Sequence, residues 1–287
     1  MTTGFIGLGT MGLPMATCLE RQGFELLGWD SDPGALQNFS NDTSSIAALA
    51  ASCDTFITML PEGEHVRAVH DQLFDAVVAD HCLFIDCSTI DVATTREIAT
   101  DLVARGHAFV DAPVSGGNEA AASGSLSFMI GGESADIERA RPWLEAMGGK
   151  LNEFGAAGAG QAAKACHNMI CGITALGVCE AFALADSLGL DLERFYQLCS
   201  GAAAQSWILE NRCPVPGPAP DAPASNDYAP GFAARLMAKD LGLAQQAAAA
   251  SGQETRFGSE AARRFEEFVE AGNGDVDFSA IYRSIRK

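Results

Sequence analysis

The chain has 287 residues, and 48% of them are hydrophobic, which is enough apolar material for one large or two ordinary folded domains. Its formal net charge of −19 argues against a surface that binds nucleic acid or an anionic membrane. Nine scattered cysteines without a Cys-x-x-Cys pair argue against a disulfide framework or a metal site and predict a reducing, cytoplasmic location. No signal peptide is expected, because the first strand begins almost directly after Met1.

The amino-terminal stretch predicts a strand over residues 3–8, a helix over 11–22 and a second strand over 24–29. A glycine triplet, Gly7-x-Gly9-x-x-Gly12, lies between the first strand and the helix. In a dinucleotide-binding turn these glycines make the tight turn, let the pyrophosphate approach, and let helix pack on strand. A lone triplet also occurs in ordinary turns, but the flanking elements favour dinucleotide binding. The expected cofactor contacts in this loop are Gly7, Leu8, Gly9, Thr10, Met11 and Gly12.

The second strand ends on Asp30, eighteen residues after Gly12. This is close to the spacing of an acid that binds the adenosine ribose hydroxyls. The carboxylates of Asp30 and Asp32 would repel a 2′-phosphate, and no arginine stands beside them. We therefore expect NAD, rather than NADP, as the cofactor.

Four further apolar runs alternate with helical patterns, at residues 55–60, 82–87, 108–112 and 127–131. This rhythm predicts a Rossmann-type, doubly wound parallel sheet, whose ligands gather at the carboxyl ends of the strands. Polar or turn-forming stretches at 60–63, 88–91 and 113–117 fall at these ends. The last contains Ser115-Gly116-Gly117, which could present backbone N–H groups to a carboxylate or could be a plain loop.

A long helix is predicted from about residue 160 to 188, joining a nucleotide-binding domain at 1–159 to a helical domain at 160–287. Lys164, one of only four lysines, lies near its start, where burial is costly without a partner. Asn168 follows one turn later on the same face, whereas His167 points about 60° away and is expected to be a packed histidine. The helix is not expected to span a membrane, because its uninterrupted apolar run is about half of the ~20 residues required.

The remaining chain predicts an all-α domain, with helices near residues 191–200, 233–250, 259–270 and 278–285. Six of the eleven prolines fall between residues 213 and 231, which predicts a formed loop at a cleft or a subunit contact. The fold class is therefore α/β: a Rossmann-type doubly wound parallel sheet, a long interdomain helix and an all-α C-terminal domain. That second domain is expected to carry the substrate cleft and the oligomer contacts.

Several motifs resemble the signatures of the β-hydroxyacid dehydrogenases: residues 5–16, 111–117, 124–132 and the pair Lys164…Asn168. Within that family, residues 214–217, 223–225 and 231–244 are most similar to the 3-hydroxyisobutyrate dehydrogenase branch. The resemblance covers nearly the whole chain. It implies NAD-dependent oxidation of 3-hydroxyisobutyrate to methylmalonate semialdehyde, as in valine catabolism, by a homodimer or homotetramer built around the long helix.

The resemblance also implies roles for individual residues. Lys164 would be the general acid/base, with Asn168 beside it, and Ser115, Gly116, Gly117 and Asn168 would hold the β-hydroxyacid. The cofactor contacts implied outside the glycine loop and Asp30 are Leu60, Pro61, Thr89, Phe232 and Lys239. Taken alone, Lys239 could equally be a solvated surface residue.

Two alternatives stay open. The segment 201–207 lacks the arginine expected before Trp207 in close 3-hydroxyisobutyrate enzymes. This keeps tartronate semialdehyde reductase, or another short-chain β-hydroxyacid dehydrogenase, as an alternative activity. The other alternative is a dinucleotide-binding module without catalysis. Lys164 argues against it, because loss of the catalytic lysine would mark such a module.

Overall fold

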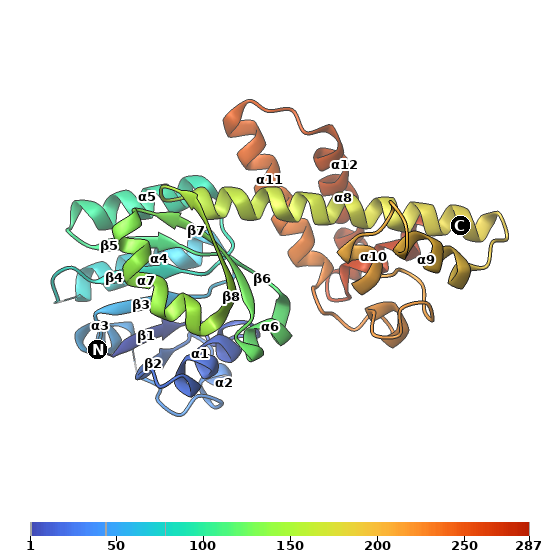
Figure 1. The fold of residues 1–287 in the computed structure, drawn as a ribbon. Coiled ribbons are helices and arrows are strands. Elements are labelled where there is room, and N and C mark those ends of the chain that lie inside the picture. Colours follow the sequence, from blue (N-terminus) through green and yellow to red (C-terminus); the bar gives the residue numbers. More distant parts are fainter. Residues whose placement is uncertain (1, 44, 78, 287) are drawn as a thin grey trace. The chain divides into compact units, whose positions relative to one another are not determined.

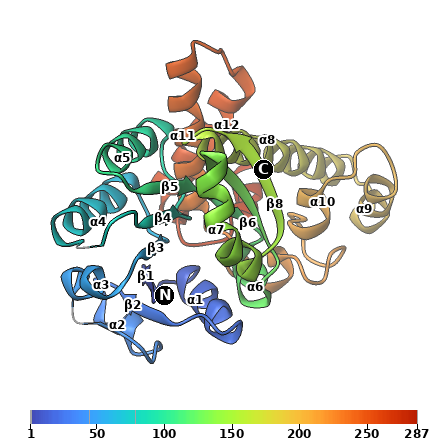
Figure 2. The same ribbon diagram turned by 60° about the vertical axis from the view of Figure 1, so that its left-hand side comes forward.

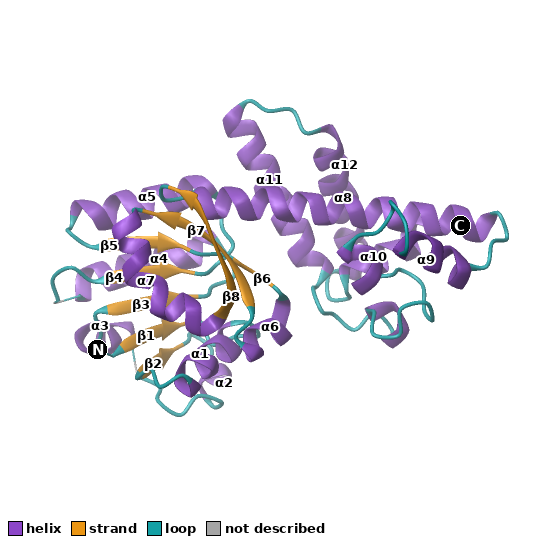
Figure 3. Cartoon of the chain, viewed as in Figure 1, coloured by secondary structure: helices purple, strands orange, loops and turns teal. Residues whose placement is uncertain are grey.

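The computed structural model describes residues 2–43, 45–77 and 79–286 (Figures 1 and 3). The chain divides into two compact units, Met1–Lys164 and Ala165–Lys287. The boundary expected after residue 159 lies a few residues before this division.

The first unit is built on an eight-stranded sheet, in the order β2-β1-β3-β4-β5-β7-β6, with β8 paired to β7. The five strands from β2 to β5 in this order are parallel neighbours. They confirm the Rossmann-type sheet predicted from the apolar runs. Their bounds are β1 Thr3–Ile6, β2 Leu26–Trp29, β3 Thr55–Thr58, β4 Leu83–Asp86 and β5 Ala108–Asp111.

Helices cover both faces of this sheet, as a doubly wound fold requires (Figure 2). One buried cluster joins the sheet to α1, α6 and α7, and another joins it to α3, α4 and α5. The separation follows from the alternation of side chains along each strand: Phe5 belongs to the first cluster and Ile6 to the second. The helices are α1 Gly12–Arg21, α2 Pro33–Leu36, α3 Ile46–Ser52, α4 Gly63–Ala76, α5 Val92–Ala104, α6 Gly117–Ser123 and α7 Ser134–Met147.

The sheet is not parallel throughout, which corrects the sequence-based expectation. β7 (Leu126–Gly132) runs antiparallel to β5 and to β6 (Val114–Ser115), while β8 (Gly148–Gly155) is parallel to β7. β7 follows β6 after only residues 116–125, a connection shorter than the dozen or more residues that a parallel crossover needs. β6 and β8 were not predicted, because one has two residues and the other is largely exposed and polar.

The predicted long helix is present as α8, Ala159–Ser187. It is also the one helix within the described residues that is long and apolar enough to cross a membrane, which is weak evidence because core helices pass the same test. The rest of the second unit is helical around a core that includes Phe182, Phe265 and Phe278. Its elements are α9 Leu192–Ser200, α10 Trp207–Asn211, α11 Ala234–Ser251, α12 Arg256–Phe268, α13 Tyr282–Ile285, the 3-10 helices Pro223–Asn226 and Phe278–Ile281, and a π-helical turn Val269–Asn273.

The proline-rich segment of the second unit has defined internal contacts. The hydroxyl of Tyr228 donates to the Pro214 carbonyl at 2.6 Å, and the Gly217 N–H donates to Ser225 Oγ at 3.2 Å. The short helix α10 and the 3-10 turn at Pro223–Asn226 were not predicted. Both are too short to show a helical period in the sequence.

Candidate active site

The glycine loop after β1 has the geometry that a dinucleotide needs. A Cβ added at Gly12 would lie 1.8 Å from the Gly7 carbonyl oxygen, so no side chain fits where α1 begins. A Cβ at Gly9 would meet no atom within 4 Å, which leaves room for a pyrophosphate to approach the backbone. The close packing at Gly12 and the open space at Gly9 therefore fit a bound dinucleotide.

Asp30 lies beside this loop at the end of β2. Its Oδ2 accepts the backbone N–H of Leu8 at 2.7 Å, and its Oδ1 accepts the N–H of Asp32 at 2.8 Å. The carboxylate is thus fixed against the glycine loop, and each oxygen keeps a further lone pair for a ribose hydroxyl. The Asp32 side chain instead accepts from the Gly34 N–H, at the start of α2.

The cofactor residues implied by resemblance divide between the two units. Leu60 and Pro61 follow β3, and Thr89 follows β4, at the same edge of the sheet as the glycine loop. Phe232 and Lys239 belong to the second unit, where Phe232 packs against Phe278 with ring centroids 6.1 Å apart. Their predicted contacts with the cofactor stay predictions.

The Ser115-Gly116-Gly117 loop joins β6 to α6. Gly116 has a φ of +134° and Gly117 a φ of +69°, a region that favours glycine. A Cβ at Gly116 would also lie 2.5 Å from the Cβ of Ala120. Both glycines are exposed in a backbone conformation that disfavours side chains, so the loop can present N–H groups to a carboxylate.

Lys164 is buried, with 7% of its surface exposed. Its Nζ donates to the carbonyl oxygen of Val114 at 2.7 Å, and the residue after Val114 is Ser115. The amine is thus held beside the start of the expected substrate loop.

Two buried residues, Asp111 and Gln161, hold the first turn of α8 in the first unit, and neither was predicted as a site residue. The carboxylate of Asp111 accepts the N–H of Gly158 at 2.7 Å through Oδ1 and that of Gln161 at 2.9 Å through Oδ2. Burial raises the pKa of Asp111 to about 6, against the effect of these two hydrogen bonds. Asp111 heads the 111–117 motif and Gln161 stands three residues before Lys164, so their positions in these motifs were the available signal.

Asn168, in the second unit, is 5% exposed. Its Nδ2 donates to Oδ2 of the buried Asp240, and its Oδ1 lies 2.8 Å from Nδ1 of His167. Because the amide oxygen can only accept, His167 Nδ1 is the donor. Lys239 Nζ lies 3.6 Å from Asp240 Oδ1. The sequence did not predict Asp240 as a site residue.

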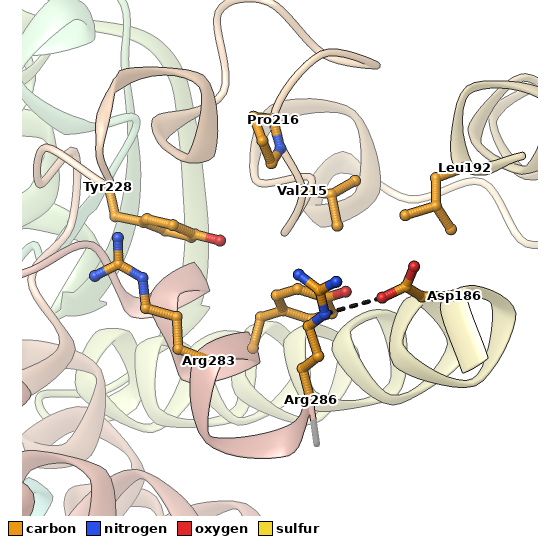
Figure 4. A pocket seen from close by; sticks show the side chains of 8 residues that line it. Asp186, Leu192, Val215, Pro216, Tyr228, Arg283 and Arg286 are labelled. Atoms are coloured by element: carbon orange, nitrogen blue, oxygen red, sulfur yellow. Dashed lines mark ion pairs between the residues drawn. The ribbon is translucent and has the colours of Figure 1, made fainter. Parts of the chain in front are cut away.

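Two other features of the described residues do not involve the predicted site. A cavity of about 480 Å³ in the second unit is lined by Tyr228, Arg283 and Arg286 among others, and none of the predicted site residues lines it (Figure 4). Arg286 pairs there with Asp186 at 2.9 Å. Separately, Glu62, Glu64 and His65 are close enough to share a metal ion, but all three are exposed and such acidic groups are common without one.

Two family models match the two parts of the chain. Residues 2–157 match the family described as the NAD binding domain of 6-phosphogluconate dehydrogenase. Residues 158–285 match the family described as NAD-binding of NADP-dependent 3-hydroxyisobutyrate dehydrogenase. A probable 3-hydroxyisobutyrate dehydrogenase of Mycobacterium tuberculosis is 43% identical, over 99% of this chain and 98% of the relative. The chain belongs to the β-hydroxyacid dehydrogenase family, and it is similar to the 3-hydroxyisobutyrate dehydrogenases in particular.

Two further relatives bear on the substrate. The NAD-dependent L-serine dehydrogenase of Pseudomonas aeruginosa is 40% identical, over 97% of this chain and 96% of the relative. A solved structure of the Mycobacterium tuberculosis 3-hydroxyisobutyrate dehydrogenase with L-serine has a TM-score of 0.94 at 43% identity, covering 100% of this chain and 99% of that one. The chain is thus an oxidoreductase with NAD as its cofactor, and its relatives act on more than one small hydroxyacid.

Proposed function

We propose that this protein oxidises 3-hydroxyisobutyrate to methylmalonate semialdehyde with NAD, as a step of valine catabolism. The observation that carries the proposal is the place of Lys164: a buried amine, hydrogen-bonded to Val114 and adjoining the Ser115–Gly117 loop. A carboxylate bound by that loop would place a β-hydroxyl within reach of the amine. The family models that match the two parts of the chain, and the relative from Mycobacterium tuberculosis, support an NAD-dependent oxidation of this kind.

In this proposal each residue has one task. The backbone N–H groups of the Ser115–Gly117 loop bind the carboxylate, and Asn168, one helical turn beyond Lys164, orients the hydroxyl through its amide. Lys164, as the neutral amine, takes the hydroxyl proton and becomes the ammonium. Bound NAD supplies the hydride acceptor. Leu60, Pro61, Thr89, Phe232 and Lys239 are proposed cofactor contacts.

A substrate panel tests the assignment. We expect the highest kcat/KM with 3-hydroxyisobutyrate and NAD, and slower turnover of 3-hydroxypropionate, because one methyl group is worth only about 1–3 kcal/mol in an apolar pocket. A different β-hydroxyacid that is better by about a hundredfold would move the assignment to that acid. Absence of turnover with every acid of the panel would favour the non-catalytic module.

L-serine is a second candidate substrate, because a relative 40% identical is an NAD-dependent L-serine dehydrogenase. Serine carries an ammonium where 3-hydroxyisobutyrate carries a methyl group, so the two acids require different neighbours in the pocket. The same panel separates them, and it should include tartronate semialdehyde with NADH as a test of the reductase alternative. We further propose a soluble, cytoplasmic homodimer or homotetramer, which sedimentation of the purified protein would test.

A further inference from the structure

The side chain of Gln161 lies in the first turn of α8 and is 1% exposed. Its Nε2 donates to the carbonyl oxygen of Ser88 at 2.8 Å, and its Oε1 accepts the N–H of Ile90 at 3.2 Å. One amide therefore holds the two backbone groups that flank Thr89. Glutamate and methionine, which are close to glutamine in length, cannot make both bonds, since a carboxylate can only accept and a thioether has no donor.

The hydrogen bonds continue from Ser88 to the ends of two strands. Ser88 Oγ accepts the N–H of Leu60 at 2.9 Å, which fixes the stretch after β3. The Ser88 N–H donates to Asp86 Oδ1 at 3.1 Å, and the hydroxyl of Thr58 donates to the same oxygen at 2.8 Å. Gln161 is thus joined to two of the first unit's segments that are proposed to contact the cofactor, Leu60-Pro61 and Thr89.

The backbone of the same turn is fixed from the other side. The Gln161 N–H donates to Asp111 Oδ2 at 2.9 Å, at the end of β5. Three residues further along α8, Lys164 Nζ donates to Val114 at 2.7 Å. Gln161 therefore stands between the Thr89 loop and the lysine, with every polar atom of its side chain engaged inside the first unit.

We infer that Gln161 is a positioning residue, which holds Lys164 at a constant separation from the Thr89 loop. The inference rests on the proposed function, in which Lys164 takes the substrate proton and Thr89 contacts the cofactor. A displacement of about 1 Å far from the chemistry can cost on the order of 10²-fold in rate. Gln161 can therefore affect kcat without contacting the substrate.

Gln161→Met tests this, because it keeps the length of the side chain and removes both hydrogen bonds. We expect kcat to fall roughly 10- to 100-fold, with the KM of the hydroxyacid and the Kd of NAD changed by less than about threefold. With substrate deuterated at the carbinol carbon, the isotope effect on kcat should increase, because hydride transfer becomes slower relative to product release.

The matched control is Trp143→Phe, which removes the hydrogen bond from Trp143 Nε1 to Thr3 Oγ1 at 2.9 Å, at the amino end of β1. This variant should lower the melting temperature but leave kcat and the isotope effect at wild-type values. A merely structural role of Gln161 predicts the same behaviour for Gln161→Met. Turnover of Gln161→Met within about twofold of wild type would therefore overturn the inference.

A second readout does not depend on activity. In the cofactor-free protein, reductive methylation followed by mass spectrometry should modify Lys164 faster in Gln161→Met than in wild type, with Lys150 and Lys239 as internal references. Gln161→Asn, one methylene shorter, should act in the same direction if the methionine variant does not fold. Unchanged modification of Lys164 in the folded variant overturns the inference. Lack of activity in the wild type would instead contradict the proposed function alone.

Discussion

The carboxyl edge of the sheet and the aromatic cluster under α4 both bury a titratable side chain, Asp111 at one and His70 at the other. Asp111 is fully buried, and each of its oxygens accepts a backbone N–H from the start of α8. His70 is 1% exposed among Phe74, Phe84 and Phe109, and neither ring nitrogen has a hydrogen-bond partner in the described part of the chain.

Buried polar groups with hydrogen-bond partners can hold neighbouring segments in place, whereas a buried polar group without partners only lowers the stability of the fold. At the edge, Asp111, Gln161 and Ser88 are hydrogen-bonded and lead to Lys164. In the cluster, burial lowers the pKa of His70 to about 3, with the charge of Arg67 as a smaller cause. Replacing a group at the edge should therefore harm turnover or folding, whereas replacing His70 by an apolar residue should not.

Among these variants, we expect the largest loss of activity when Lys164 is replaced. Lys164→Ala should reduce kcat by about 10²–10⁴-fold, the usual loss of a general acid–base, while NAD affinity and the melting temperature stay close to wild type. Lys164→Arg should not restore turnover, because a guanidinium does not release its proton. Loss of folding or of NAD binding together with activity would show a structural lysine, and retained turnover would show a dispensable one. All three quantities should be measured on the same variant.

Asp111→Ala tests the hydrogen-bonded group at the carboxyl edge of the sheet. It leaves the N–H groups of Gly158 and Gln161 without their acceptor, at about 1–3 kcal/mol for each buried group. We expect the free energy of unfolding, measured in urea, to fall by roughly 2–5 kcal/mol. A loss below about 1 kcal/mol would mean that the two N–H groups find other acceptors.

Asp30→Ala tests a second carboxylate at the carboxyl edge of the sheet. Wild type should prefer NAD to NADP in kcat/KM, and the alanine variant should narrow this preference by about 10- to 100-fold, since the charge facing a 2′-phosphate is removed. The variant also loses the acceptor of the Leu8 N–H, so activity with NAD should fall as well. Asp32→Ala is the comparison variant, because Asp32 contacts Gly34 instead of the glycine loop. Equal efficiency with both cofactors in the wild type would contradict the prediction.

At the carboxyl edge of the sheet, the sequence predicted the features that depend on residues close together in the chain. The glycine loop, Asp30 and the parallel strands β1 to β5 follow from short motifs and local periodicity, and the structure has them. The predicted direction of β7 was wrong, because an apolar run does not indicate whether its strand is parallel or antiparallel to its neighbours. Gln161, Asp111 and Asp240 were missed, because their partners lie far along the chain: Asp111 is 50 residues from Gln161, and Asp240 is 72 from Asn168.

His70→Leu should give the smallest effect, visible as a change in the pH dependence of stability. Because the folded-state pKa of His70 is about 3 and the unfolded value about 6.5, the unfolded chain binds more protons between these values. Stability from this residue is therefore present above pH 6.5 and is lost as the pH falls toward 3, at up to about 1.4 kcal/mol per pH unit. Asp111 acts oppositely, since its raised pKa lets the folded state bind the extra proton between pH 3.8 and about 6.

The free energy of unfolding of His70→Leu, minus that of wild type, should therefore grow as the pH is lowered from 6.5 to 4. Leucine is close to histidine in volume and suits the surrounding phenylalanine rings, so little packing is lost. His65→Leu, on the exposed face of the same helix, is the matched control and should give curves parallel to wild type. Parallel curves for His70→Leu itself would show that His70 is solvated or paired in solution, and the contrast with Asp111 would then fail. A difference that grows toward acid pH would show instead that only the edge needs its buried polar groups.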